Sequence, residues 1–248
     1  MEILTWLYRF FRSLPLSAWH NSSLQHLRLD NFTMNPEQRK EASELQLHKR
    51  GIRINVQLHV IESDEEVTLR DSDALLQRLI ALWAVVSAAQ ARDCSASRAY
   101  LAAHQLESCL SAQERIFLLG ATPDEAAYRQ FAQRQEALYF LAWCAGLTEK
   151  IAVPAAASNL KPILKLFPFA LEAPDKLTAA MRLRSKSLIM DWSDLLYRLH
   201  WEVRHTQLTG RPCPASIDAA VIREWHQAVN WICQYEEEHD WDQVSTET

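Results

Sequence analysis

Residues 191–208 read DWSDLLYRLHWEVRHTQL, a stretch with the regular spacing of a long helix. Its apolar side chains recur every three or four residues, as expected for one face of an α-helix. A helix with one such face needs another helix or a sheet to cover it. We therefore predict a core helix here, whose apolar stripe consists of Trp192, Leu195, Leu196, Leu199 and Val203.

The opposite side of this predicted helix is charged and aromatic. Asp194, Arg198 and Glu202 follow one another at intervals of four residues, where side chains are neighbours on a helix surface. The simplest interpretation is a solvated ladder of ion pairs. Tyr197 and Trp201 lie on the same side, however, and two large aromatic side chains are seldom left in water together. We expect another element, a second subunit or a ligand to cover this face.

Helical patterns recur through most of the chain and predict a mainly α protein with a single multi-helix domain. The four glycines each follow a helical run, at the place where a left-handed residue ends a helix. With Gly51, Gly120, Gly146 and Gly210 assigned to this role, none remains for a phosphate-binding loop or a nucleophile elbow. The predicted helices cover residues 2–13, 36–50, 72–92, 97–108, 111–119, 123–145, 174–187, 191–208 and 218–235.

Capping residues mark most of the predicted helix starts. Asn35 precedes a proline, which fits the first position of a helix because proline has no N–H to satisfy. Ser111 with Glu114, and Thr122 with Glu125, fit the capping-box pattern. The other candidate caps are Ser72 with Asp73, and Ser216 or Asp218.

One segment has the alternation of a β-strand. From Ile52 to Val60 every second residue is apolar, and the residues between them are polar. A period of two with β-branched side chains is typical of a half-buried strand. A second short extended run follows at residues 67–69. We therefore predict a small β-hairpin near residues 52–69, with helices covering its apolar face.

Composition and charge limit the possible functions. The 248 residues carry a formal net charge of −5, which disfavours nucleic acid as a partner because such binding depends on Lys and Arg contacts to phosphate. An acidic surface suits a basic partner, although the same charge is ordinary for a soluble protein. The five cysteines include no C-x-x-C pair and indicate a reducing compartment. We expect a cytoplasmic protein without a cofactor.

The first residues form a separate segment in this interpretation. Their apolar stretch begins with MEILTWLYRFF, and its internal charges make a poor secretory signal. We predict an N-terminal amphipathic arm or extension over residues 1–33 and a single helical domain over residues 34–248. The arm packs on the protein surface or, alternatively, contacts a membrane through residues 1–14 as an interfacial helix. Met34 is an alternative natural start.

Most candidate functional residues lie on the two C-terminal helices, and Arg134 and Glu136 lie on the helix predicted over residues 123–145. The polar sides of the two C-terminal helices, if adjacent, form a structural network that fixes helix register, a ligand or partner site, or a set of acid and base catalysts. His200 and His205 do not share a helix face, and no H-E-x-x-H motif occurs, so we expect no metal site and name no catalytic residue. The candidate ligand-binding or partner-binding residues are Arg134, Glu136, Asp194, Arg198, His200, Trp201, Arg223, Glu224 and Asn230.

The end of the chain is acidic and carries one aromatic anchor. The run from Glu236 to Asp240 is interpreted as a solvated helix end rather than a cation site, because hard cations need ligands folded around them. We expect Trp241 to dock into a groove of its own domain, since termini with such an anchor are usually tied down.

Short motifs along the chain resemble those of a bacterial family, domain of unknown function 4272. They include NPEQRK at residues 35–40, GIRIN at residues 51–55, YRLHW at residues 197–201 and DWDQVST at residues 240–246. The resemblance extends over residues 34–248 and implies a mainly helical, bacterial, cytosolic protein. It implies no activity.

These observations lead to one functional expectation and one alternative. We expect a non-catalytic protein that acts by binding another protein, in the manner of an immunity or adaptor protein. The alternative is an enzyme that acts on a small polar substrate through Asp194, Arg198, His200 and Glu224. The oligomeric state is left open.

Overall fold

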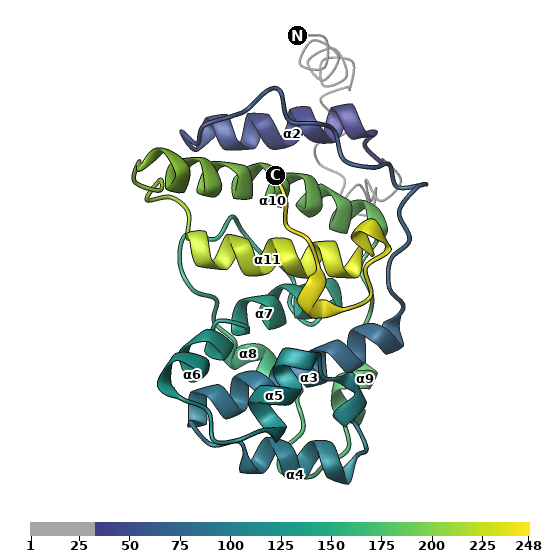
Figure 1. The fold of residues 1–248 in the computed structure, drawn as a ribbon. Coiled ribbons are helices and arrows are strands. Elements are labelled where there is room, and N and C mark those ends of the chain that lie inside the picture. Colours follow the sequence, from purple (N-terminus) through teal and green to yellow (C-terminus); the bar gives the residue numbers. More distant parts are fainter. Residues whose placement is uncertain (1–32) are drawn as a thin grey trace, which may run out of the picture. The chain divides into compact units, whose positions relative to one another are not determined.

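The computed structural model describes residues 33–248. The helix predicted at residues 2–13 and the membrane contact considered for residues 1–14 lie outside this range. Residues Met34–Thr248 form one compact unit. This unit is built almost entirely from helices (Figure 1), so the predicted mainly α class is confirmed. The α-helices are α2 (Pro36–Lys49), α3 (Ser72–Ala91), α4 (Ser95–Ala103), α5 (Ala112–Leu119), α6 (Glu125–Ala132), α7 (Gln135–Cys144), α8 (Lys161–Leu164), α9 (Asp175–Ala180), α10 (Lys186–Thr209) and α11 (Ala219–Ile232).

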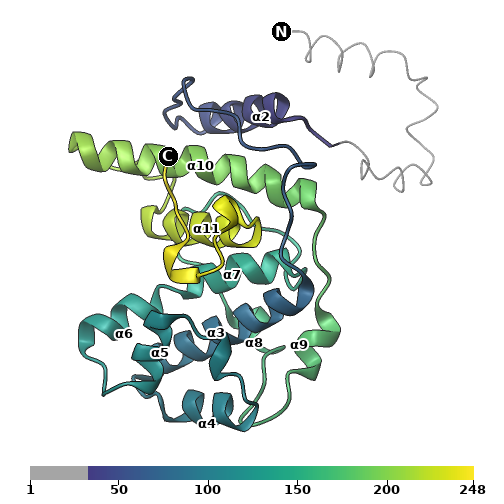
Figure 2. The same cartoon turned by 45° about the vertical axis from the view of Figure 1, so that its right-hand side comes forward.

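The long helices are stacked in layers (Figures 1 and 2). Helix α2 packs on α10, α10 on α11, α11 on α7, and α7 on α3, while α4, α5 and α6 pack around α3. Helix α10 therefore has a neighbour on both sides. Its apolar stripe faces the core, where Leu196 and Leu199 are fully buried. Its polar side is buried as well, which confirms that another element covers the face carrying Asp194 and Arg198.

Helix α3 is a long and strongly apolar helix. Among residues 33–248, it alone is long and apolar enough to cross a membrane by length and composition. In this structure, 61% of its most apolar stretch is buried by the protein. Leu75, Leu79 and Leu82 have no exposed surface. Packing against α4, α5, α6 and α7 accounts for this composition.

The predicted β-hairpin at residues 52–69 is wrong. These residues form an extended segment from α2 to α3 (Figure 1), and the described residues contain no paired strands. Side-chain cations take the place of a partner strand. Lys40 Nζ donates to the carbonyls of Val56 and Leu58 at 2.9 and 2.7 Å. Lys186 Nζ donates to two further carbonyls of the segment, both at 2.7 Å.

The side chains of this extended segment also depart from the alternation. Ile52 and Leu58 are buried, but Val56 and Val60 are 63% and 42% exposed. The turn at residues 56–58 rotates the backbone, so the apolar residues do not share one face. The period of two therefore indicates extended backbone correctly, but it does not show that the segment pairs into a sheet.

Several predicted helix boundaries are wrong. The helix expected over residues 123–145 is divided at Gln133 and Arg134 into α6 and α7. This division lets α6 pack on α3 while α7 reaches α11. The helix expected over residues 174–187 is the short α9, which ends at Ala180. Helix α10 begins at Lys186, earlier than predicted.

Carboxylates replace hydroxyl groups at two predicted helix caps. Asp124, not Thr122, caps α6 and accepts from the Ala127 N–H. Asp71, not Ser72, caps α3. Both residue types satisfy the free N–H groups of a first turn, so the pattern alone does not select between neighbours. The confirmed caps are Asn35 and Ser111, each with a complete capping box, and Asp218.

Three of the glycines end helices in the left-handed conformation, as predicted. Gly51, Gly146 and Gly210 have φ angles of +68°, +75° and +66°. The prediction is wrong for Gly120, whose φ is −78°. There a Cβ atom would collide with the Ile116 carbonyl, so the position requires glycine for space and not for its φ angle.

Candidate functional site

The predicted cluster of polar residues does not form one site. Its members belong to separate networks. Arg198 Nε and Nη2 donate to the two carboxylate oxygens of Asp194 at 2.9 and 2.7 Å. Arg198 Nη2 also donates to the His59 carbonyl at 3.1 Å. Asp194 and Arg198 are 0% and 2% exposed, so this pair holds the extended segment onto α10 and does not reach solvent.

Sequence reasoning missed a second buried arginine at the same interface. Arg39 has no exposed surface and donates to Asp191 at 2.9 Å and to Asp64 at 2.7 Å. Arg39 lies on α2, Asp191 on α10 and Asp64 on the extended segment. Arg39 lies on the same face of α2 as buried Ser43 and Leu47, and this spacing of four residues was the available signal.

Arg134 and Glu224 form another network between α7 and α11. Arg134 Nη1 donates to Gln227 at 2.6 Å and to Glu224 at 3.2 Å. Burial raises the pKa of the Glu224 carboxyl, and Arg134 opposes this shift. The guanidinium of Arg134 lies 5.9 Å from the ring centre of Trp241, which is 2% exposed. The predicted docking of Trp241 is therefore confirmed.

Two imidazoles form a third network, between α10 and α11. His200 Nδ1 and His226 Nδ1 are 2.9 Å apart, and Asn230 Nδ2 lies 3.3 Å from His226 Nε2. Asn230 also donates to the Ser245 carbonyl at 2.8 Å. Because an amide nitrogen only donates, His226 Nε2 accepts, so its proton is on Nδ1 and His200 Nδ1 accepts in turn. The remaining His200 N–H faces the backbone at Thr246.

Both imidazoles of this pair are neutral. Burial, together with the nearby Arg204 and Arg223, lowers the pKa of His200 to about 4. Burial, together with His200, lowers the pKa of His226 to about 3. Both nitrogens of His226 are hydrogen-bonded, and Asn230 connects this pair to the C-terminal residues through the Ser245 carbonyl.

The other candidate residues lie apart from these networks. The Glu136 carboxylate accepts from the backbone N–H of Ser158 at 3.0 Å. Trp201 stacks on His205 with 4.8 Å between ring centres. Arg223 is exposed. Asn230 also lines a surface cavity.

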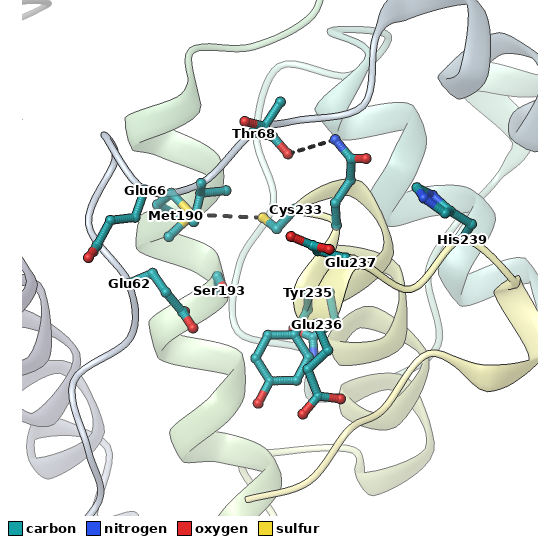
Figure 3. A pocket seen from close by; sticks show the side chains of 13 residues that line it. Glu62, Glu66, Thr68, Met190, Ser193, Cys233, Tyr235, Glu236, Glu237 and His239 are labelled. Atoms are coloured by element: carbon teal, nitrogen blue, oxygen red, sulfur yellow. Dashed lines mark hydrogen bonds between the residues drawn. The ribbon is translucent and has the colours of Figure 1, made fainter.

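This cavity consists of two adjoining pockets of about 450 and 350 Å³. Glu62, Ser193, Asn230 and Tyr235 line both pockets, so the two form one continuous acidic groove. Its walls are the extended segment, α10, α11 and the C-terminal residues (Figure 3). The other lining residues are Glu66, Val67, Thr68, Met190, Cys233, Gln234, Glu236, Glu237 and His239 in one pocket, and His59, Val60, Ile61, Tyr197, His226, Glu247 and Thr248 in the other.

Glutamates surround the acidic groove, and the residues that line it include no Lys or Arg. Glu62 and Glu66 come from the extended segment, and Glu236 and Glu237 from the opposite wall (Figure 3). Burial raises the pKa of the Tyr235 phenol, and Glu236, Glu62 and Glu247 raise it further. Their carboxylates thus produce a negative potential around this ring. Within residues 33–248, no group of His, Cys, Asp and Glu is arranged to hold a metal ion.

Two polar side chains inside the acidic groove have unused hydrogen-bonding capacity. Ser193 is 8% exposed, and its hydroxyl has no hydrogen bond to any described residue. Asn230 is 6% exposed, and while its Nδ2 donates to Ser245, its Oδ1 accepts from no residue in the described range. Both atoms are open to the acidic groove, so they are available to a ligand that enters it.

The wall that carries Glu236 and Glu237 is held in an unusual conformation. Gln234, Glu236 and Glu237 have φ angles of +52°, +56° and +57°, which cost free energy in residues other than glycine. Arg70 holds this turn in place. It donates to the Trp231 carbonyl at 2.7 Å and to the Glu238 carbonyl at 2.6 Å. Sequence reasoning treated this acidic run as a solvated helix end, and the groove behind it was not predicted.

Residues 39–244 match the family described as Domain of unknown function (DUF4272). The chain belongs to this family. The resemblance expected from the sequence motifs is therefore confirmed, and the DUF4272 match includes Ser193, Asn230 and the acidic turn. No curated protein and no solved structure matches the chain.

Proposed function

We propose that this DUF4272 protein is a non-catalytic binding protein, that its ligand is another protein, and that the acidic groove is the contact site. The observation that carries the proposal is the pair of unpartnered polar groups, Ser193 Oγ and Asn230 Oδ1, inside a groove surrounded by glutamates. An acidic site favours a basic partner, because complementary charge increases the association rate and specificity.

The geometry gives less support to the alternative of an enzyme acting on a small polar substrate. Asp194 and Arg198 are buried against each other, and Glu224 is bound by Arg134. His200 and His226 satisfy each other, so neither has a free lone pair for a substrate proton. A general base must come within hydrogen-bonding distance of the proton it removes.

The proposal includes a bacterial cytoplasmic setting. Cys94, Cys109, Cys144, Cys213 and Cys233 are all free thiols. Free thiols persist in the reducing cytoplasm, where disulfides are rare. Burial raises the pKa of Cys233 to about 12, so the thiol in the groove stays protonated and unreactive.

A capture experiment with matched variants tests the proposed function. The full chain is immobilised as wild type, as a groove variant with Glu62, Glu236 and Glu237 changed to Gln, and as a control variant. The control changes Glu41, Glu107 and Glu149 to Gln, which removes the same charge from exposed positions outside the groove. We expect wild type and control to retain a bacterial protein that the groove variant loses.

A photoreactive amino acid at position 235 then locates the contact. A crosslink from this position to the retained protein supports the groove as the binding site. Equal retention by all three forms of the protein, or a crosslink pattern that omits position 235, contradicts the proposed function.

A further inference from the structure

We propose that the acidic groove receives the guanidinium group of an arginine side chain. This inference rests on the proposed function, because the arginine belongs to the bound protein. It adds the chemical group that is recognised and the atoms that recognise it.

The charge of the acidic groove favours a cation. Glu62 and Glu66 on one wall face Glu236 and Glu237 on the other, with Ser193 and Tyr235 between them (Figure 3). Among the described residues, no cationic side chain lies within hydrogen-bonding distance of the carboxylates of Glu62, Glu236 or Glu237. The fourth carboxylate, that of Glu66, accepts a hydrogen bond from the Ser63 N–H at 2.9 Å. A cation that enters therefore gains charge-assisted hydrogen bonds.

The inner surface of the groove requires hydrogen-bond donors. Asn230 Oδ1 is an acceptor and cannot donate, so a group that satisfies it must carry an N–H or O–H. The amide orientation is fixed by the bonds of Nδ2 to Ser245 and His226. The Ser193 hydroxyl accepts a second bond from the same ligand. A carboxylate cannot donate to Asn230 Oδ1, and the glutamates around the groove repel it.

A guanidinium fits these acceptors better than an ammonium. It has five N–H donors in one plane, whereas an ammonium has three on a single atom. The groove offers acceptors on both walls and inside, and its aromatic side chains are the half-buried Tyr197 and Tyr235. Planar guanidinium groups stack on such rings. The protein itself uses this arrangement at Arg70, whose guanidinium lies 4.5 Å from the Trp231 ring centre and binds two carbonyls.

The test is a titration of the ¹⁵N-labelled full chain with small probes. The probes are N-acetyl-arginine methylamide, its lysine counterpart and its citrulline counterpart. Citrulline has nearly the shape of arginine but no charge. We expect the arginine probe to shift the resonances of Ser193, the Asn230 side-chain amide and Tyr235. We expect it to bind roughly tenfold more tightly than the citrulline probe.

Two variants relate this binding to the proposed atoms. Ser193→Ala removes an unpartnered hydroxyl, so the fold is retained while affinity falls roughly threefold. Glu62 is exposed, and Glu62→Gln should weaken binding roughly fivefold. The matched control Glu41→Gln, on α2, should leave the dissociation constant unchanged.

Each contrary result has a distinct meaning. Equal binding of arginine and citrulline probes, or of wild type and both groove variants, overturns the inference. Tighter binding of the lysine probe overturns the guanidinium assignment. If no probe binds while capture still depends on the groove glutamates, the inference fails and the proposed function stands. If the arginine probe binds but capture is unaffected by the groove variant, the proposed function fails.

Discussion

At the scale of single residues, the neutral histidine pair is the most consequential feature of this fold. His200 and His226 share one hydrogen bond, and His226 also accepts from Asn230. In this series of hydrogen bonds, the proton of each imidazole has one position. Adding another proton to either ring breaks a hydrogen bond and places a charge in a buried site.

This arrangement predicts a loss of stability in mild acid. The folded-state pKa values of about 4 and 3 lie below the 6.5 of the unfolded chain, so the unfolded state binds more protons. The contribution to stability is full above pH 6.5 and is lost as the pH falls toward 4. Urea unfolding should show a decrease on the order of 3 kcal/mol over this range, and the decrease should be smaller in a His226→Leu variant, which keeps only His200. Parallel curves for the two proteins would contradict the neutral pair.

The buried pair of Asp194 and Arg198 gives a second prediction at this scale. Arg198→Ala leaves the Asp194 carboxylate buried without its partner and should cost about 3–5 kcal/mol in the free energy of unfolding. Adding Asp194→Ala should recover part of this loss, because the two residues interact directly. Arg223→Ala, at an exposed position on α11, is the control and should change stability by less than about 0.5 kcal/mol. A stable Arg198→Ala protein would indicate that the pair is not structural.

At the scale of elements, the C-terminal residues are fastened to the helices by Trp241. Its ring packs against Trp231 with 5.8 Å between centres and lies 4.8 Å from the Arg78 guanidinium. Trp241→Ala should cost about 3 kcal/mol through lost apolar contact and an unfilled cavity. The free energy of unfolding in guanidinium chloride measures this cost. A variant as stable as wild type would place the indole in solvent.

The elements also show what the sequence could and could not predict. Helix patterns and caps are local, so most of the helices, including α10, α11 and the capping box at Ser111, could be predicted. The extended segment could not, because its carbonyls bind Lys40 and Lys186, which lie far away in sequence. A local alternation does not reveal whether a partner strand or distant side chains satisfy the backbone.

The candidate site was predicted less well than the fold. The sequence placed polar residues on α10 and α11 correctly, but it could not assign their partners, since Arg198 faces the extended segment and Glu224 faces α7. The groove requires residues from three distant stretches, near Glu62, Ser193 and Tyr235, to come together. Only Asn230 was on the list of candidates. The acidic run was visible, but its packing depends on Arg70, more than 160 positions earlier.

At the scale of the whole molecule, residues Met34–Thr248 have their own core and form one compact unit. A protein that begins at Met34 should therefore fold, with a melting temperature close to that of the full chain. Thermal unfolding followed by circular dichroism tests this expectation. Loss of solubility or of cooperative unfolding would show that residues 1–33 cover part of the helical unit.

The left-handed turn at the groove wall indicates where a substitution can raise the stability of this protein. Glycine adopts the backbone conformation of Glu236, with φ +56°, without a Cβ clash. Glu236→Gly should therefore raise the free energy of unfolding by up to about 1 kcal/mol, whereas Glu236→Gln, which keeps the strain, should not. Equal stabilities would show that the turn is not strained. Both changes remove one charge and should weaken arginine binding alike. A more stable protein is thus one substitution away, and that substitution removes one of the charges of the proposed binding site.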